Sequence, residues 1–262
     1  MNIDKRLAAS AIILTWLMTL PAAALYQFAF PAELIGRQYT AQTRLSKDGS
    51  PFGESTTKFE KLLYQGKTFL VVTGRSSGTI QGKAFASRVV RYFLLADGRI
   101  TSYSLQGETK SDSQPWTDYD IRFNWANLTA LVKYNDYQKK EKISKTVPLQ
   151  PQLVAITDLD LYLSSLPARG VREEKLKALL PNGQTFGFLL KLAAGPATVT
   201  SQGRSVAARR IELKPDLGLI SNFIPNVNYW VKAESPYELV RYAGAISGPG
   251  SPDVIQEIWR TD

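Results

Sequence analysis

Hydrophobic and polar residues alternate with a period of two along most of this chain. The clearest example is the segment QPWTDYDIRFNWANL, residues 114–128, whose apolar positions include Tyr119, Ile121, Phe123 and Trp125. The positions between them are polar or charged: Asp118, Asp120, Arg122 and Asn124. Because successive side chains of a β-strand point to opposite faces, this pattern predicts an antiparallel strand with one buried and one solvated face.

The same alternation recurs in segments that are separated by short turn sequences. The strand-like segments are RQYTAQTRLS, TKFEKLLY, KTFLVVTG, SRVVRYFLL, RITSYSLQ, ALVKYNDY, TFGFLLKL and AARRIELK, followed by the closing runs of the chain. The turn sequences include KDGSPFG, YQGK, ADGR, PNGQ and SQGR, with the Gly, Asn and Asp residues typical of hairpins. Roughly a dozen short strands at hairpin spacing indicate an all-β, mainly antiparallel fold, either a single curved sheet or a barrel-like domain.

Two segments depart from this period. In Thr157–Gly170, Leu159, Leu163 and Leu166 recur at helical spacing, and the glycine is suited to end a helix. The segment Arg172–Pro181 has a weaker helical pattern. We therefore expect one or two short helices that cover one mouth of the curved sheet.

The first residues have the features of an export signal. The basic residues Lys5 and Arg6 precede the apolar run Leu7–Ala24, which ends in three alanines after a proline. This pattern predicts a signal peptide over residues 1–24, cleaved between Ala24 and Leu25. The alternative is an uncleaved anchor, because the run approaches the ~20 residues of a membrane-spanning helix. Residues 25–262 are then expected to form one β-rich domain in the periplasm of a Gram-negative-type envelope.

The chain is basic, with 32 Lys and Arg residues against 23 Asp and Glu. Removal of residues 1–24 takes away two basic side chains and one acidic one, so the net charge falls from +9 to +8. Since an exported protein seldom meets nucleic acid, the expected partners are lipid head groups, another anionic envelope component or an envelope protein. The densest basic cluster, Lys139–Lys145, alternates across a strand, so it is typical of either a solvated edge or a binding patch.

Composition excludes most common catalytic designs. The chain has no His and no Cys, so it lacks imidazole bases, thiolate nucleophiles, disulfides, lipid-modified cysteines and the usual zinc or iron–sulfur ligands. We expect no cofactor and no metal site. The sequence STTK, Ser55–Lys58, matches a Ser-x-x-Lys nucleophile motif, but on a strand these two residues point to opposite faces. Asp118 and Asp120 lie beside Arg122 as a charge ladder, and Asp158 and Asp160 are placed to favour a helix N-terminus.

The closing stretch NYWVKAESPYELVRYAGAISGPGSPDVIQEIW, Asn228–Trp259, predicts a hairpin and a final strand. Trp230 shares a strand face with Asn228, Lys232 and Glu234, which is unusual for core packing and suits a cavity rim or a partner contact. Tyr237 and Arg241 follow in the same hairpin, and Arg241 could bind an acidic head group. These three residues are the candidate ligand- or partner-binding site.

The same stretch resembles the end of the exported bacterial domain-of-unknown-function family numbered 3108. The segments VPLQPQLVAITDLDLYLSSLP and VAARRIEL resemble the middle and penultimate regions of that family, so that the resemblance spans Gly36–Asp262. It implies an exported β-rich domain without an assigned reaction, and it supplies no catalytic residues.

Two classes of function are consistent with these features. The first is a non-enzymatic envelope protein whose curved sheet holds a lipid, another apolar molecule or a partner, with a filled-core scaffold as its simplest form. The second is a carboxylate- or Lys-dependent hydrolase that acts on envelope glycan or lipid. The absence of His and of a convincing catalytic pair favours the first class.

Overall fold

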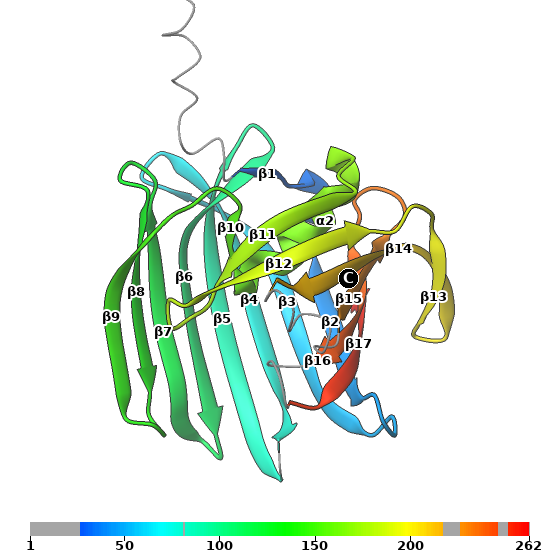
Figure 1. Cartoon of the computed structure of the whole chain (residues 1–262), viewed down its shortest axis with the longest axis horizontal. Coiled ribbons are helices and arrows are strands. Elements are labelled where there is room, and N and C mark those ends of the chain that lie inside the picture. Colours follow the sequence, from blue (N-terminus) through cyan, green and yellow to red (C-terminus); the bar gives the residue numbers. More distant parts are fainter. Residues whose placement is uncertain (1–26, 81, 217–225, 246–250, 262) are drawn as a thin grey trace, which may run out of the picture.

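The computed structural model describes residues 27–80, 82–216, 226–245 and 251–261. The predicted signal peptide and its cleavage site at Ala24–Leu25 lie outside the described residues. The described strands form one 17-stranded, curved and almost wholly antiparallel sheet around a short helix (Figure 1). The all-β, mainly antiparallel fold predicted from the alternation is therefore confirmed.

Eight consecutive strands form a tall wall in which each strand pairs with the next. They are β2 (Gln38–Leu45), β3 (Pro51–Tyr64), β4 (Lys67–Ile80), β5 (Lys83–Ala96), β6 (Arg99–Ser111), β7 (Gln114–Asn124), β8 (Thr129–Asp136) and β9 (Glu141–Pro148). The turns Gln65–Gly66 and Asp97–Gly98 have positive φ at both residues, the geometry whose twist suits two-residue hairpins. The short strand β1 (Phe28–Ala29) pairs with the start of β6.

The remaining strands complete the curve. They are β10 (Leu153–Ala155), β11 (Glu173–Leu179), β12 (Thr185–Leu192), β13 (Ala197–Ser201), β14 (Arg204–Pro215), β15 (Val227–Lys232), β16 (Leu239–Ala245) and β17 (Asp253–Arg260). Strand β17 pairs with β2 and so joins this part to the wall, while β10 and β11 form a parallel pair. No ladder joins β9 to β10 within the described ranges, so the curved sheet stays open at that seam.

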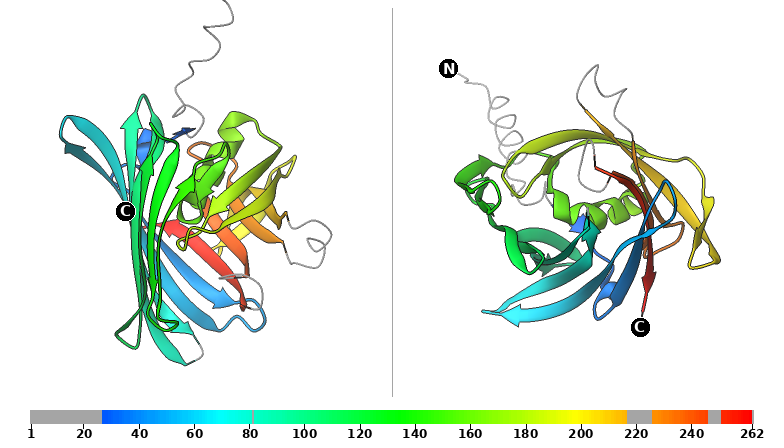
Figure 2. Two further views of the ribbon diagram at one scale, coloured as in Figure 1. Left: turned by 60° about the vertical axis from the view of Figure 1, so that its left-hand side comes forward. Right: turned by 90° about the horizontal axis from the view of Figure 1, so that it is seen from below.

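The helix α2 (Leu159–Arg169) lies inside the curve of the sheet (Figure 2, right). It follows the 3₁₀ turn η3 (Ile156–Asp158) and ends at Gly170, whose φ of 66° gives the left-handed cap that glycine favours. Another 3₁₀ turn, η2 (Ala32–Leu34), follows β1. The helix predicted over Thr157–Gly170 is confirmed.

The main core lies between this helix and the inner face of the sheet. The buried hydrophobic side chains of the helix are Leu159, Leu161, Tyr162, Leu163 and Leu166. A second cluster joins the wall to β10 and β11, and it includes Ile121 with Tyr119, Phe123 and Trp125 packed against it. The inward face predicted for residues 119–125 is thus the one that packs against this cluster.

The second predicted helix, Arg172–Pro181, is wrong, because this segment forms strand β11. Leu176 and Ala178 are buried in the main core, and the strand pairs with β12 along its whole length. The i, i+2 spacing of Leu176 and Ala178 therefore decides the structure. A segment of about ten residues with so few apolar positions fits either period until its partners are known.

Candidate functional site

A pocket of about 370 Å³ lies inside the curve, between α2 and the strands β2, β3, β16 and β17. Its apolar lining comes from the segment after β1, from the helix and from the inner face of the sheet: Phe30, Leu34, Phe59, Ile156, Leu159, Leu161, Leu239, Val254 and Ile258. The volume is at the lower end of the range of small-molecule sites, and the lining has the mixture of apolar and polar groups found in such sites.

Uncharged polar groups occupy one side of this pocket. The Gln256 amide nitrogen donates to the Thr43 hydroxyl at 3.2 Å and to the Ser55 hydroxyl at 3.4 Å. Gln256 lies on the inner face of β17 between Val254 and Ile258, which also line the pocket. Three neighbouring strands thus place amide and hydroxyl groups against an otherwise apolar space.

A first charged cluster stands at the turn between β15 and β16. Glu238 is buried, and its carboxylate accepts a hydrogen bond from the Tyr39 hydroxyl at 2.5 Å and pairs with the Lys232 ammonium. Burial alone would raise the pKa of Glu238, but the hydrogen bonds from Lys232 and Tyr39 outweigh it and hold the pKa below its usual value. The carboxylate that lines the pocket is therefore ionised and already neutralised by its own partners.

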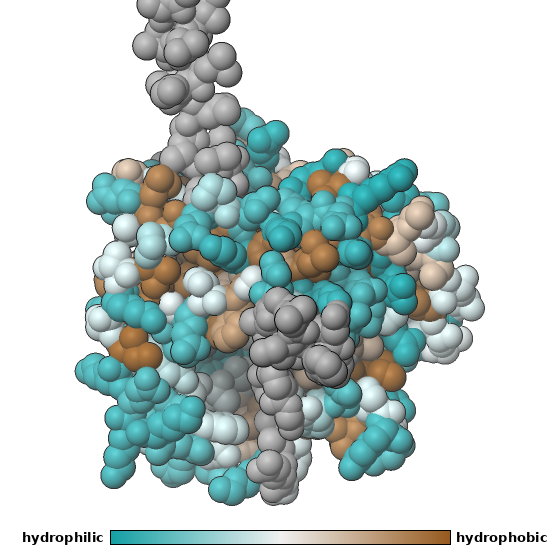
Figure 3. Space-filling view, in the orientation of Figure 1, coloured by the Kyte–Doolittle hydropathy of each residue, from teal (hydrophilic) through white to brown (hydrophobic). Residues whose placement is uncertain are grey.

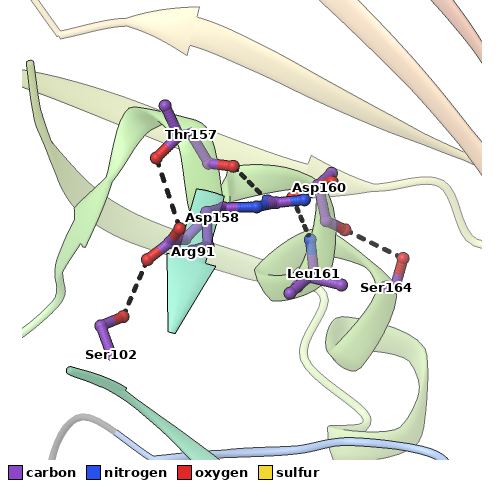
Figure 4. A network of polar contacts seen from close by, with 7 residues as sticks. All are labelled: Arg91, Ser102, Thr157, Asp158, Asp160, Leu161 and Ser164. Carbon is purple, nitrogen blue, oxygen red and sulfur yellow. Dashed lines mark hydrogen bonds and ion pairs between the residues drawn. The ribbon is translucent and has the colours of Figure 1, made fainter. Parts of the chain in front are cut away.

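A second charged cluster joins the wall to the start of α2 (Figure 4). Arg91 of β5 is 5% exposed, and its Nη1 and Nη2 lie 2.6 and 3.1 Å from the two carboxylate oxygens of Asp160. Nη1 also donates to the carbonyl oxygen of Thr157. This bidentate pair fixes the first turn of the helix to the sheet, and Asp160 faces the pocket from there.

Asp158 belongs to the same cluster but is only 1% exposed, and it is not among the residues that line the pocket. It accepts hydrogen bonds from the hydroxyls of Ser102 at 2.8 Å and Thr157 at 3.3 Å. Burial raises the pKa of Asp158 to about 6, against the opposing effects of Arg91 and Ser102. Asp158 stands at the N-cap position without a side-chain cap hydrogen bond, so its polar contact is with the sheet rather than with the helix end.

Two tyrosines complete the inner face of the closing hairpin. Tyr229 and Tyr242 are cross-strand partners with ring centroids 5.0 Å apart, and both line the pocket. The Tyr242 hydroxyl donates to the carbonyl oxygen of Ala245 at 2.5 Å. Burial raises the pKa of Tyr229, and it raises the pKa of Tyr242 to about 12, so both are neutral hydroxyl groups at physiological pH.

The structure brings Trp230 and Arg241 together on the other face of this hairpin. They are cross-strand partners, and the Arg241 guanidinium carbon lies 5.6 Å from the centre of the Trp230 ring. Neither residue lines the pocket, to which Tyr229 and Tyr242 contribute instead. Tyr237 lies in the intervening turn, where its N–H donates to the carbonyl oxygen of Glu234 at 2.9 Å.

Trp230 is half-buried because another hairpin covers this outer face. Trp230 packs against a small apolar cluster that also contains Val199, Val206, Ala208 and Val240. Strand β13 reaches over β16 and β17, and the Thr200 carbonyl oxygen and the Gln202 N–H contact Arg241 and Glu257. The Trp230 side chain shares its strand face with polar residues, but it packs against apolar residues of other strands.

Sequence reasoning missed Arg91, Glu238 and Gln256. Each has the same signal, a polar residue at an inward position of a strand or at its end: Arg91 falls between Val89 and Phe93, both of which pack inward. The prediction that Ser55 and Lys58 point to opposite faces of their strand is confirmed. Ser55 lines the pocket, while Lys58 pairs with Glu60 at 2.8 Å on the other face.

The described residues show neither a metal site nor a membrane-crossing helix. No group of three or more Asp or Glu side chains in these ranges is placed to hold a metal ion. Within the same ranges, no helix is long and apolar enough to cross a membrane. Asp120 pairs with Arg122 at 2.9 Å, and Asp118 accepts hydrogen bonds from Asn135 and Tyr137, so both carboxylates have structural partners.

Comparisons with known proteins relate the chain by fold. No family model matches the sequence, so the resemblance to family 3108 stays a prediction. No curated protein matches it either. A beta-barrel-like protein of the domain of unknown function DUF1849 from Brucella abortus matches with a TM-score of 0.50 and 9% identity, over 86% of this chain and 96% of that chain. The chain therefore shares its overall fold with a bacterial β-rich domain of unknown function.

Two further solved structures match less closely. The hypothetical lipoprotein YmcC from Escherichia coli has a TM-score of 0.25 and 11% identity, over 96% of this chain and 97% of that chain. A porin-like protein from Bacteroides uniformis has a TM-score of 0.26 and 8% identity, over 89% of this chain and 99% of that chain. Both TM-scores are too low to relate the folds.

Proposed function

We propose that this chain is an exported, non-enzymatic envelope protein that holds an apolar molecule with an uncharged polar end in the pocket beside α2. The observation that carries this proposal is the lining of the pocket. Apolar side chains form most of its surface, and Gln256, Thr43 and Ser55 offer hydrogen bonds on one side. Asp160 and Glu238 already form ion pairs with Arg91 and Lys232. The ligand therefore does not have to carry a positive charge to neutralise these two carboxylates.

The alternative, a carboxylate- or Lys-dependent hydrolase acting on envelope glycan or lipid, is less well supported. A general acid or base needs a carboxyl group that reaches the substrate with a pKa suited to proton transfer. Asp160 is held in a bidentate pair and Glu238 has a lowered pKa. Asp158 has a raised pKa but does not line the pocket.

Trp230, Tyr237 and Arg241 are proposed as a separate contact for an envelope partner. Trp230 and Arg241 form a cation–π pair on the outer face, opposite the pocket. Surface Trp and Arg residues are enriched in protein interfaces, which supports this assignment.

Export to the periplasm is the premise of this proposal and can be tested directly. We expect the intact mass of protein from the periplasmic fraction to correspond to a chain that begins at or near Leu25. Recovery of the chain from the cytosol with Met1 still present would contradict export.

Native mass spectrometry after gentle purification tests the pocket. We expect the wild-type protein to retain a co-purified apolar molecule, and we expect Ile258→Trp, which fills the pocket, to lose it. Phe186→Trp is the matched control, because Phe186 is exposed and does not line the pocket. Equal retention by Ile258→Trp, with the fold intact by circular dichroism, would exclude the pocket as the binding site.

A further inference from the structure

Exposed apolar side chains gather at one end of the wall. Among the described residues, eight large hydrophobic side chains are exposed: Leu62, Leu63, Tyr64, Tyr103, Leu128, Leu131, Tyr137 and Phe186. The first six lie in the turns and strand ends at the upper end in Figure 1, where β3, β5 and β7 finish. The lower end of the wall is mainly hydrophilic in the space-filling view (Figure 3). Most of the exposed large apolar side chains of the wall therefore lie at one end.

The tip of the β3–β4 hairpin is the most prominent part of the apolar end. Leu62, Leu63 and Tyr64 are 43%, 71% and 59% exposed. On one side, the last pair between β2 and β3 is Gln38–Lys58, and on the other, the pairing of β4 with β5 begins only at Phe69–Leu94. Residues 60–68 thus form a two-stranded ribbon that neither neighbouring strand covers, and it projects from the body (Figure 2, left).

The apolar residues of this ribbon cannot all be buried by the protein's own sheet. Leu62 and Tyr64 point to one face of the ribbon and Leu63 to the other, because consecutive strand residues alternate. The tip projects from the body and is apolar on both faces, so a partner that contacts one face would leave the other face in water. A projecting apolar tip suits a medium that surrounds it, as the headgroup and acyl boundary of a bilayer does.

Two lysines flank the apolar tip, and the acidic residue of the ribbon, Glu60, is paired with Lys58. Lys61 and Lys67 are exposed and flank the apolar residues. Within the described part of the chain neither lysine has an ion pair, whereas Lys58 further down the strand is paired with Glu60 at 2.8 Å. Long Lys side chains beside inserted apolar residues can reach lipid phosphates, which adds attraction to an anionic surface.

The described chain also begins at this end. Strand β1 pairs with the start of β6, with Ala29 opposite Arg99 and Phe28 opposite Ile100. The apolar run Leu7–Ala24 therefore joins the β domain at the same end as the exposed ribbon. In a precursor that still carries this run in the membrane, the ribbon would lie on the membrane side of the domain, so the tip is tested in protein that begins at or near Leu25.

We propose that the tip of the β3–β4 hairpin inserts into the surface of an anionic bilayer. Leu62 and Leu63 enter the boundary between head groups and acyl chains, Tyr64 lies at the level of the head groups, and Lys61 and Lys67 contact lipid phosphates. The pocket faces the interior of the curve and the tip lies outside it, so this membrane contact does not depend on what the pocket holds.

The absence of cysteine allows a test by site-specific labelling of the full chain. Leu63→Cys carries a polarity-sensitive fluorophore at the tip, and Tyr137→Cys carries it at the opposite end, where Tyr137 is 50% exposed. With vesicles of phosphatidylglycerol and phosphatidylethanolamine, we expect emission at position 63 to rise at least ~2-fold and to shift to the blue, because the label leaves water. Emission at position 137 stays unchanged. Both labelled proteins begin at or near Leu25, because an attached apolar run Leu7–Ala24 would bring this end of the domain to the vesicle by itself.

Further variants show whether the side chains of the tip produce this signal. In the Leu63→Cys background, the double variant Leu62→Ser with Tyr64→Ser should abolish the rise in emission. In the same background, Lys61→Glu with Lys67→Glu should reduce the rise in emission by about tenfold at low salt. The charge variant also serves if the serine variant loses its β-sheet circular dichroism. The proposal is overturned by equal signals at positions 63 and 137. A signal at position 63 that grows with protein concentration without vesicles also overturns it, since that would show contact between copies.

Discussion

Two acidic clusters each contribute one carboxylate to the same pocket, Asp160 at the start of α2 and Glu238 at the closing hairpin, and they are stabilised in different ways. At the helix, the guanidinium of Arg91, a residue that is 5% exposed, interacts with two carboxylates. It forms an ion pair with Asp160 and attracts Asp158 electrostatically without a hydrogen bond. At the closing hairpin, Glu238 alone is served by the Tyr39 hydroxyl and by Lys232, whose side chain is 43% exposed. The pKa of Asp158 is raised and that of Glu238 is lowered. Burial therefore controls the direction of the pKa shift where two carboxylates share one cation. Hydrogen-bond partners control it where one carboxylate has two donors.

Breaking the helix cluster should have the largest effect. Arg91→Met leaves the buried Asp158, and Asp160 with its 34% exposed side chain, without their cation, which costs about 3 kcal/mol of unfolding free energy, the lower end for a buried pair. Urea denaturation measures the loss. Arg88→Met on the same strand is the control, because Arg88 is exposed, and its effect should stay within about 0.5 kcal/mol. A loss for Arg91→Met as small as the control's would mean that the cluster does not hold the helix.

Breaking the hairpin cluster should cost less. Tyr39→Phe removes one hydrogen bond to the Glu238 carboxylate and leaves Lys232 in place, so we expect a loss of about 1–3 kcal/mol. The same denaturation assay at neutral pH measures it. Tyr64→Phe serves as control, since Tyr64 is exposed at the hairpin tip. If Tyr39→Phe costs as much as Arg91→Met, the two clusters are equivalent and the comparison fails.

The outer face of the closing hairpin should respond differently from its inner face. Trp230→Ala removes a half-buried ring from a small cluster, so a loss of about 1–2 kcal/mol is expected, below the ~3–5 kcal/mol of a fully buried ring. Retention of the pocket molecule should be unchanged and capture of an envelope partner should fall, as pull-down and native mass spectrometry can measure. Loss of the pocket molecule in this variant would place Trp230 in the pocket site.

The smallest effects are two opposite pH dependences. The folded state binds the Asp158 proton more tightly than the unfolded chain, whose pKa is near 3.8. Relative to Asp158→Asn, the wild type should therefore gain stability as pH falls from ~7 to ~5, through the folded pKa of about 6. Melting temperatures of both proteins across this range measure the difference. Parallel curves would contradict the raised pKa.

Glu238 should show the other sign. Its folded pKa lies below the unfolded value of 4.5, so its ionised form stabilises the protein above that pH. Relative to Glu238→Gln, the wild type should lose stability as pH falls below 4.5 and through the folded pKa. A gain in that range would show that burial, and not Lys232 and Tyr39, controls this group.

The strands and the helix could be predicted from the sequence because they depend on local periods. The inward face of residues 119–125 and the helix with its Gly170 end required only the positions of apolar residues and a cap. The pocket could not be predicted in this way. Arg91 and Asp160 are 69 positions apart and Tyr39 and Glu238 are 199 apart, so their pairing depends on how the sheet curves. The half-buried state of Trp230 likewise depends on β13, which pairs with β14 and not with the strand that carries Trp230.

The pairing of β17 with β2 has a consequence for how the protein folds. The wall from β2 to β9 is built from hairpins between neighbouring segments, so its contacts are local and close early. The register Val254–Leu45 to Arg260–Tyr39 joins segments near opposite ends of the described chain and carries a large loop-closure entropy. We infer that this seam closes late. Until it does, β2 presents an unpaired edge, and the pocket, which needs β2, β3, β16 and β17 together, does not exist. A nascent chain of this protein therefore forms the pocket only after β17 has been synthesised.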